Sequence, residues 1–133
     1  MILLDTSAWI EYDRATGSEV HLRVRELVRS QAEIVSTEPI LMELLAGARS
    51  DASANAIREI HASFGWIAAD ASTDFEGAAS IYRACCSAGV TPRGLVDCLI
   101  AAIALRSGAS VLAHDRDFDR ISDVVPLRLD SYN

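Results

Sequence analysis

Short apolar runs along the chain alternate with longer stretches in which apolar residues recur at helical spacing. The first run, Met1–Leu4, ends at Asp5, and a similar run around Val111 and Leu112 ends shortly before Asp115. Such short runs, bounded by polar residues, are typical of buried strands. Pro126 indicates a sheet edge for the last run, because proline has no N–H to donate to a neighbouring strand. The pattern predicts strands at residues 1–5, 33–37, 110–113 and 124–129, with a weaker candidate at 66–69.

The segments between these runs have helical periodicity. Val20, Val24, Leu27 and Val28 recur at the spacing of one helix face, with arginines on the other face. Strands that alternate with helices predict an α/β fold with a mostly parallel central sheet and helices on both faces. Thr6 or Ser7 is expected to cap the first helix, Pro39 to stand in the first turn of the third, and Ser72 or Thr73 to cap the fifth. The predicted helices cover residues 6–14, about 18–30, 39–48, 51–64, 73–87 and 95–106, with one more helical turn at 117–122.

Length and composition favour one domain over residues 1–133. Half of the residues are apolar, which allows a sizeable core, and no linker-like or low-complexity stretch divides the chain. The longest uncharged apolar stretch, Cys98–Leu105, is far shorter than the roughly 20 residues of a membrane-spanning helix. The first ten residues do not resemble a signal peptide, and Cys85 and Cys86 are adjacent. We therefore expect a cytoplasmic protein with reduced cysteines and no membrane association.

The charge balance opposes binding to a polyanion. The formal net charge is −7 and the isoelectric point is about 4.8, which disfavours a DNA-binding module that acts through a basic stripe. All 12 basic residues are arginines. The guanidinium group suits phosphate because it donates two parallel hydrogen bonds. The absence of lysine excludes haloacid-type phosphatases, response-regulator receivers and P-loop proteins, each of which needs a lysine.

Four acidic residues stand where a functional site is expected. Asp5 and Asp115 follow predicted strands at the carboxyl edge of the sheet, where open α/β sheets bind their ligands. Asp97 lies in the first turn of the most apolar helix, and Glu43 interrupts an apolar run. Taken singly, each is equally well explained as a helix cap, a dipole partner or a solvated side chain.

Clustered together, these carboxylates would repel one another unless they bound a proton or a hard divalent cation. Zinc is disfavoured, because the cysteines and the three histidines, His21, His61 and His114, show no ligand spacing.

Four segments together resemble the PIN domain, and within it the VapC-type toxins of bacterial type II toxin–antitoxin pairs. They extend over most of the chain in the order and spacing of that family, which implies a three-layer α/β fold. The segments are residues 2–7 (Ile-Leu-Leu-Asp-Thr-Ser), 39–44 (Pro-Ile-Leu-Met-Glu-Leu), 97–102 (Asp-Cys-Leu-Ile-Ala-Ala) and 111–118 (Val-Leu-Ala-His-Asp-Arg-Asp-Phe).

The resemblance assigns roles to particular residues. It implies that Asp5, Asp97 and Asp115 hold the metal, that Glu43 orients water or a second ion, and that Thr6 forms a hydrogen bond within the site. Asp117 is a possible fifth acid, and His114 departs from the small polar residue frequent at its position. From their places beside the acids, we also expect Arg93 and Arg116 to contact substrate phosphates.

The resemblance implies an endoribonuclease that uses Mg²⁺, or Mn²⁺ in its place, to cleave RNA with a metal-activated water. It also implies a small VapB-like antitoxin and a homodimer within the toxin–antitoxin complex. Trp9, Tyr12 and the apolar side of residues 38–48 are candidates for the antitoxin groove, although burial in the core is the commoner fate of such residues. The alternatives are a catalytically degenerate PIN fold that only binds a partner, a PIN nuclease acting on DNA, and a housekeeping nuclease without toxicity.

Overall fold

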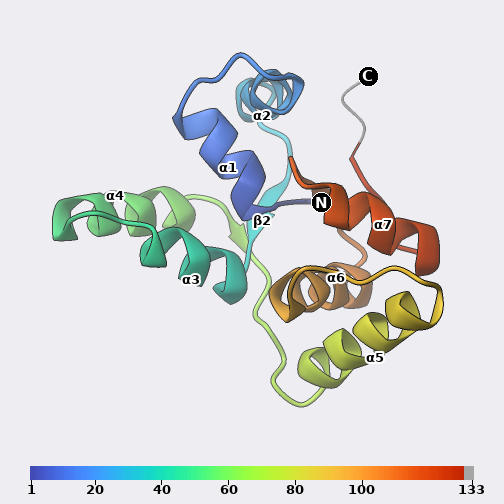
Figure 1. Ribbon diagram of the computed structural model, residues 1–133. Coiled ribbons are helices and arrows are strands. Elements are labelled where there is room, and N and C mark those ends of the chain that lie inside the picture. The colour runs from blue at the N-terminus through green and yellow to red at the C-terminus, as the bar shows by residue number, and fades with distance from the viewer. Residues whose placement is uncertain (131–133) are drawn as a thin grey trace.

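The computed structural model describes residues 1–130 and contains one four-stranded parallel sheet within that range (Figure 1). The strands lie in the order β3-β2-β1-β4, and Leu3 in β1 pairs with Val35 in β2 and Val111 in β4. All four strands therefore end at the same edge, as predicted for a parallel sheet. Their bounds are Ile2–Leu4 (β1), Ile34–Ser36 (β2), Gly65–Trp66 (β3) and Ser110–Leu112 (β4).

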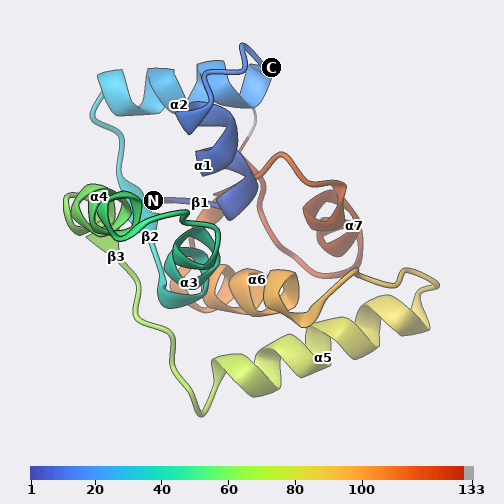
Figure 2. The ribbon, with the colours of Figure 1, turned by 60° about the vertical axis from the view of Figure 1, so that its left-hand side comes forward.

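Helices cover both faces of this sheet. In two views, α1 (Thr6–Asp13) and α2 (Glu19–Arg29) lie on one side of the strands, and α5 (Asp74–Ser87) and α6 (Leu95–Ser107) lie on the other (Figures 1 and 2). The three-layer α/β prediction is confirmed. The remaining helices are α3 (Glu38–Ala46), α4 (Asp51–Ala62) and α7 (Arg116–Val124).

Helix α6 forms the centre of the core. Its residues Cys98–Ala104 are all buried, because the helix packs between the sheet and α5. The two helices approach closely at Gly77, where an added Cβ would lie 3.3 Å from the Cβ of Ala102. Gly108 ends α6 in the left-handed conformation, with φ of 74°, which glycine adopts without steric cost. No helix in residues 1–130 is both long and apolar enough to cross a membrane.

The predicted strand at residues 124–129 is wrong in most of its length. Val124 belongs to α7, which is longer than the single predicted turn because Phe118 and Ile121 are buried one turn apart. The following segment reaches the sheet only at Leu129, which forms an isolated parallel bridge with Val111 of β4. The edge position was predicted correctly, but Pro126 and the end of α7 leave few N–H groups to extend a ladder.

Candidate metal centre

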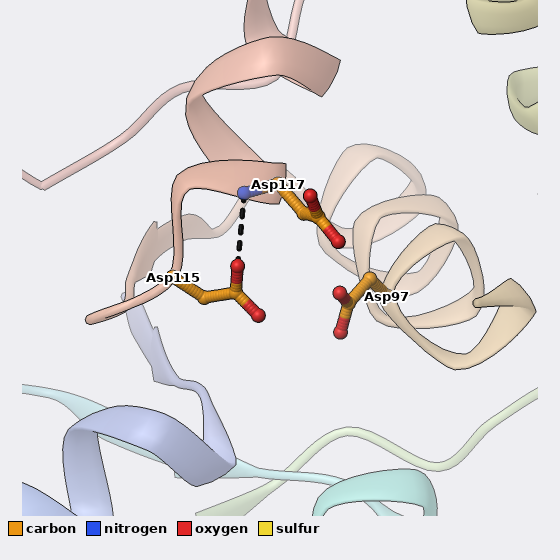
Figure 3. Close-up of side chains that lie close together, drawn as sticks. All are labelled: Asp97, Asp115 and Asp117. Atoms are coloured by element: carbon orange, nitrogen blue, oxygen red, sulfur yellow. Dashed lines mark hydrogen bonds between the residues drawn. The ribbon is translucent and has the colours of Figure 1, made fainter. Parts of the chain in front are cut away.

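Three carboxylates meet at the carboxyl edge of the sheet. Asp97 projects from the first turn of α6, Asp115 precedes α7, and Asp117 lies in the first turn of α7. One oxygen from each lies within 4.8 Å of the others (Figure 3). Asp117 entered the sequence analysis only as a possible fifth acid, yet it is a full member of this group and is only 1% exposed.

The two acids of α7 are fixed by hydrogen bonds. The main-chain N–H of Asp117 donates to Asp115 Oδ1 at 2.9 Å, the contact drawn in Figure 3, so that Asp115 is also the N-cap of the helix. Arg93 donates to Asp117 Oδ2 through Nε at 3.1 Å and to Asp115 Oδ1 through Nη2 at 2.6 Å. Burial acts to raise the pKa of Asp117, but bonds from the main chain and side chain of Arg93 hold it below its ordinary value.

Asp5 lies beside this group at the end of β1. Its Oδ2 accepts hydrogen bonds from the N–H and hydroxyl of Ser7 at 3.0 and 2.6 Å, which makes Asp5 the N-cap of α1 in place of the predicted Thr6 or Ser7. Its other oxygen, Oδ1, is buried without a hydrogen-bond partner in residues 1–130. Burial raises the pKa of Asp5 to about 6, and the charge of Glu43 adds to the effect.

Ser7 was not predicted as a site residue. Its hydroxyl oxygen accepts a bond from the N–H of His114 at 2.8 Å while its proton is donated to Asp5. It therefore ties the end of β1 to the segment after β4. A small hydroxyl residue two positions after a strand-ending acid was the only signal, and it is equally typical of an ordinary helix start.

Glu43 enters from α3 and is held by Thr6, whose hydroxyl donates to Glu43 Oε1 at 2.8 Å. The bond crosses 37 residues of sequence and agrees with the expectation that Thr6 forms a hydrogen bond within the site. Glu43 is partly exposed, and its charge reaches both Asp5 and Asp97. Part of the Glu43 residue is therefore open to water.

Asp97 shows most clearly that the charges are crowded. Burial raises the pKa of its carboxyl to about 7, and the charges of the four other acids, Asp5, Asp115, Asp117 and Glu43, raise it further. Asp5 and Asp97 therefore lie buried among like charges, which a proton or a divalent cation would offset. Oxygen-only ligands, together with the unpartnered Oδ1 of Asp5, are the donor set that Mg²⁺ or Mn²⁺ prefers. The cluster fits a divalent metal.

A basic rim adjoins the acids. A cavity of about 410 Å³ is lined by Asp115 and Asp117 on one side, and its other residues are Arg93, Arg116, Arg120 and His114. Arg116 is exposed there, as the sequence analysis expected for a phosphate contact, whereas Arg93 and Arg120 bind the acids in this structure. His114 Nε2 lies 3.5 Å from Glu11 Oε1.

A parallel α/β sheet that gathers five acids at its carboxyl edge defines a class of small domains suited to binding divalent cations. The PIN domain family matches residues 2–124. Ribonuclease VapC11 of Mycobacterium tuberculosis is 44% identical in an alignment of 133 positions that covers 99% of each chain.

Solved structures with the same fold include VapBC-1 from nontypeable Haemophilus influenzae, with a TM-score of 0.75, 22% identity and coverage of 99% of this chain and 98% of that one. Another is VapC20 of M. tuberculosis, described as a sarcin–ricin loop cleaving toxin, with a TM-score of 0.69, 21% identity and coverage of 96% and 99%. The chain belongs to the PIN domain family, and its full-length relatives include VapC ribonucleases.

Proposed function

We propose that this protein is an Mg²⁺-dependent endoribonuclease and the toxin of a toxin–antitoxin pair, with Mn²⁺ as a substitute metal. The observation that carries the proposal is the convergence of Asp5, Glu43, Asp97, Asp115 and Asp117 from four segments of the chain. The name of VapC11 and the description of VapC20 support RNA as the substrate. The presence of every acid expected of the family disfavours a binding-only domain.

The residues divide the work between binding the metal and binding RNA. Asp5, Asp97 and Asp115 would hold the ion, with Asp117 supporting them. When bound, the ion lowers the pKa of a coordinated water and offsets the charge of the phosphate. Glu43, whose carboxylate accepts a hydrogen bond from Thr6, would orient the attacking water and accept its proton. The arginines of the rim would bind the phosphates on either side of the scissile bond.

The decisive experiment is cleavage of a labelled pool of structured RNA by the purified chain, free of antitoxin, in Mg²⁺, Mn²⁺ or EDTA. We expect cutting in either metal and none in EDTA. Cutting that persists in EDTA would remove the metal from the proposal.

Growth arrest on induction, relieved by a co-expressed antitoxin, separates a toxin from a housekeeping nuclease.

Arg93 is expected to change partners when metal and substrate bind. Its side chain is 73% exposed although it contacts Asp115 and Asp117, so it can turn toward a phosphate once a cation neutralises those acids. We expect Arg93→Ala to weaken RNA binding about tenfold and to lower the slope of log affinity against log salt by about 0.7, the value of one phosphate contact to a single strand.

The RNA-binding measurement is made in Mg²⁺ with Glu43→Gln as the background, so that cleavage does not interfere while Asp5, Asp97 and Asp115 can still hold the metal. Arg83→Ala is the control. Arg83 is exposed on α5, on a different helix from every acid of the site. If the RNA affinity and the salt slope of Arg93→Ala are unchanged, Arg93 does not contact RNA and its role is limited to holding Asp115 and Asp117.

The partners are proposed from the surface and from the relatives. The solved VapBC structures support a VapB-like antitoxin. A groove of about 460 Å³ between α3, α5 and α6 supports a second copy of this chain, since Met42, Phe75 and Leu95 along it are 54%, 58% and 58% exposed. Trp9, a candidate for a partner groove in the sequence analysis, is only 2% exposed and belongs to the core.

Light scattering tests the homodimer directly. We expect the purified chain to have about twice its 14.4 kDa mass and Leu95→Asp to have the monomer mass, because a charge in the groove would be buried at the interface. Glu76→Gln on α5 is the control, because Glu76 is exposed and is not part of the groove. A monomeric wild type over the range of concentrations used would rule out the proposed dimer.

A further inference from the structure

Thr37 ends β2 in the way that Asp5 ends β1. It is fully buried, with 0% exposure, and its hydroxyl has no hydrogen-bond partner in residues 1–130. Its backbone is extended, with φ of −154° and ψ of 164°. A buried hydroxyl without a partner is costly and needs an explanation.

Helix capping does not explain this hydroxyl. Thr37 occupies the N-cap position of α3, yet its side chain makes no cap bond. Ser18 and Ser50 stand at the N-caps of α2 and α4 with similar extended backbones, and their hydroxyls do accept the expected N–H bonds, at 3.1 Å in both cases. Thr37 therefore has the backbone of a cap but a side chain directed elsewhere.

The register of the sheet shows what lies beside Thr37. Leu3 pairs with Val35 in the parallel ladder of β1 and β2. Asp5 and Thr37 each follow the last residue of their strand. Continuing the register of the ladder by two residues brings Asp5 opposite Thr37, on the same face. Asp5 Oδ1 is also buried without a partner. An unused donor and an unused acceptor thus stand on adjacent strand ends.

We propose that Thr37 is a positioning residue for the metal site: its hydroxyl donates to Asp5 Oδ1 in the metal-loaded protein, after rotation of the side chain. Ser7 already holds Oδ2 at 2.6 Å, so the second bond fixes the plane of the carboxylate. A carboxylate oxygen has two lone pairs, and Oδ1 can accept from Thr37 while it faces a cation. Such outer partners orient the ligands of metal sites.

The inference rests on the proposed metal site, and its test measures metal binding without RNA. Mn²⁺ affinity is measured by calorimetry, and the thermal midpoint in EDTA is measured alongside it. We expect Thr37→Val, which keeps the shape but lacks the hydroxyl, to weaken Mn²⁺ binding about tenfold, within the range of about 10–100-fold found for outer partners of metal ligands. Thr37→Ser, which restores the hydroxyl, should bind within about twofold of wild type by the same reasoning.

Ser50→Ala serves as the matched control, because it removes a hydroxyl that does cap a helix. It should lower the thermal midpoint and leave Mn²⁺ affinity unchanged. If Thr37→Val binds Mn²⁺ as tightly as wild type, or if Thr37→Ser is as weak as Thr37→Val, the positioning role is wrong and the metal site stands. If wild type itself binds no Mn²⁺, the metal site is wrong and the role of Thr37 is lost with it.

Discussion

Asp5→Asn is expected to reduce RNA cleavage on the order of 10³-fold while the protein stays folded, the scale seen when one electrostatic contact to a reacting group is removed. The asparagine oxygen can still accept both bonds from Ser7, so the start of α1 is preserved. The variant loses the negative charge that a divalent cation requires, at the buried oxygen that has no hydrogen-bond partner among residues 1–130. The measurement is the single-turnover rate on labelled RNA at saturating Mg²⁺, for wild type and variant purified identically.

Asp51→Asn is the control for this substitution. Asp51 is an exposed acid in the first turn of α4. Replacing it with asparagine removes the same charge at a place away from the site. It should cleave at the wild-type rate. A contaminating ribonuclease would give equal rates in all three preparations. Wild-type cleavage by a verified Asp5→Asn protein would remove Asp5 from the metal ligands.

The acids explain how a chain with a net charge of −7 can act on a polyanion. Five of its 19 acidic residues lie in one cluster, and a divalent cation there offsets two charges at the point where phosphate must bind. The cavity that Asp115 and Asp117 line also contains three arginines, of which Arg93 and Arg120 pair with these acids and Arg116 is exposed. The whole-chain charge therefore describes the surface poorly at the one place where RNA would meet it.

The bounds of an element could be predicted from the local sequence where residues that begin and end a helix or strand flank it. Helix α6 was predicted almost to the residue, because its apolar run ends at Gly108, which adopts the left-handed conformation there. The prediction of a strand at residues 124–129 was wrong because Val124 and Leu127 suit either a helix end or a strand. The choice depended on the burial of Phe118 and Ile121 on one side of α7, which is a tertiary contact.

The site could be predicted only at residues whose type and position in the sequence together indicate a ligand. Asp5 and Asp115 follow apolar strands, and that position alone suggested the carboxyl edge. The sequence around Ser7 and Thr37 gives no such signal, since the roles of their hydroxyls depend on residues at the ends of neighbouring strands. Arg93 was expected to bind substrate, but its bonds to Asp115 and Asp117 span more than 20 residues and could not be inferred from spacing.

The Asp97→Asn variant should be more stable than wild type in EDTA at pH 8 and inactive in Mg²⁺. The pKa of Asp97 is about 7 in the folded protein against an ordinary value of 3.8. Between these values the folded state keeps a proton that the unfolded state has released, so this group stabilises the fold less as pH rises and destabilises it fully above pH 7. Asparagine removes that cost, which we take as about 2 kcal/mol, or a rise of about 5 °C in thermal midpoint.

The difference between variant and wild type isolates Asp97 from groups that titrate nearby. Burial lowers the pKa of His61, so that residue favours the folded state more as pH rises, in opposition to Asp97. Both proteins share His61, and its effect cancels in the difference. The gain in midpoint should therefore be near zero at pH 4, grow through pH 5–7 and level off above it. Mn²⁺ should raise the midpoint of wild type more than that of the variant, because only wild type gains by neutralising the acid. A variant no more stable than wild type at pH 8 would show that burial and the neighbouring acids do not disfavour the ionised Asp97 carboxylate, and would remove that part of the argument for the metal site.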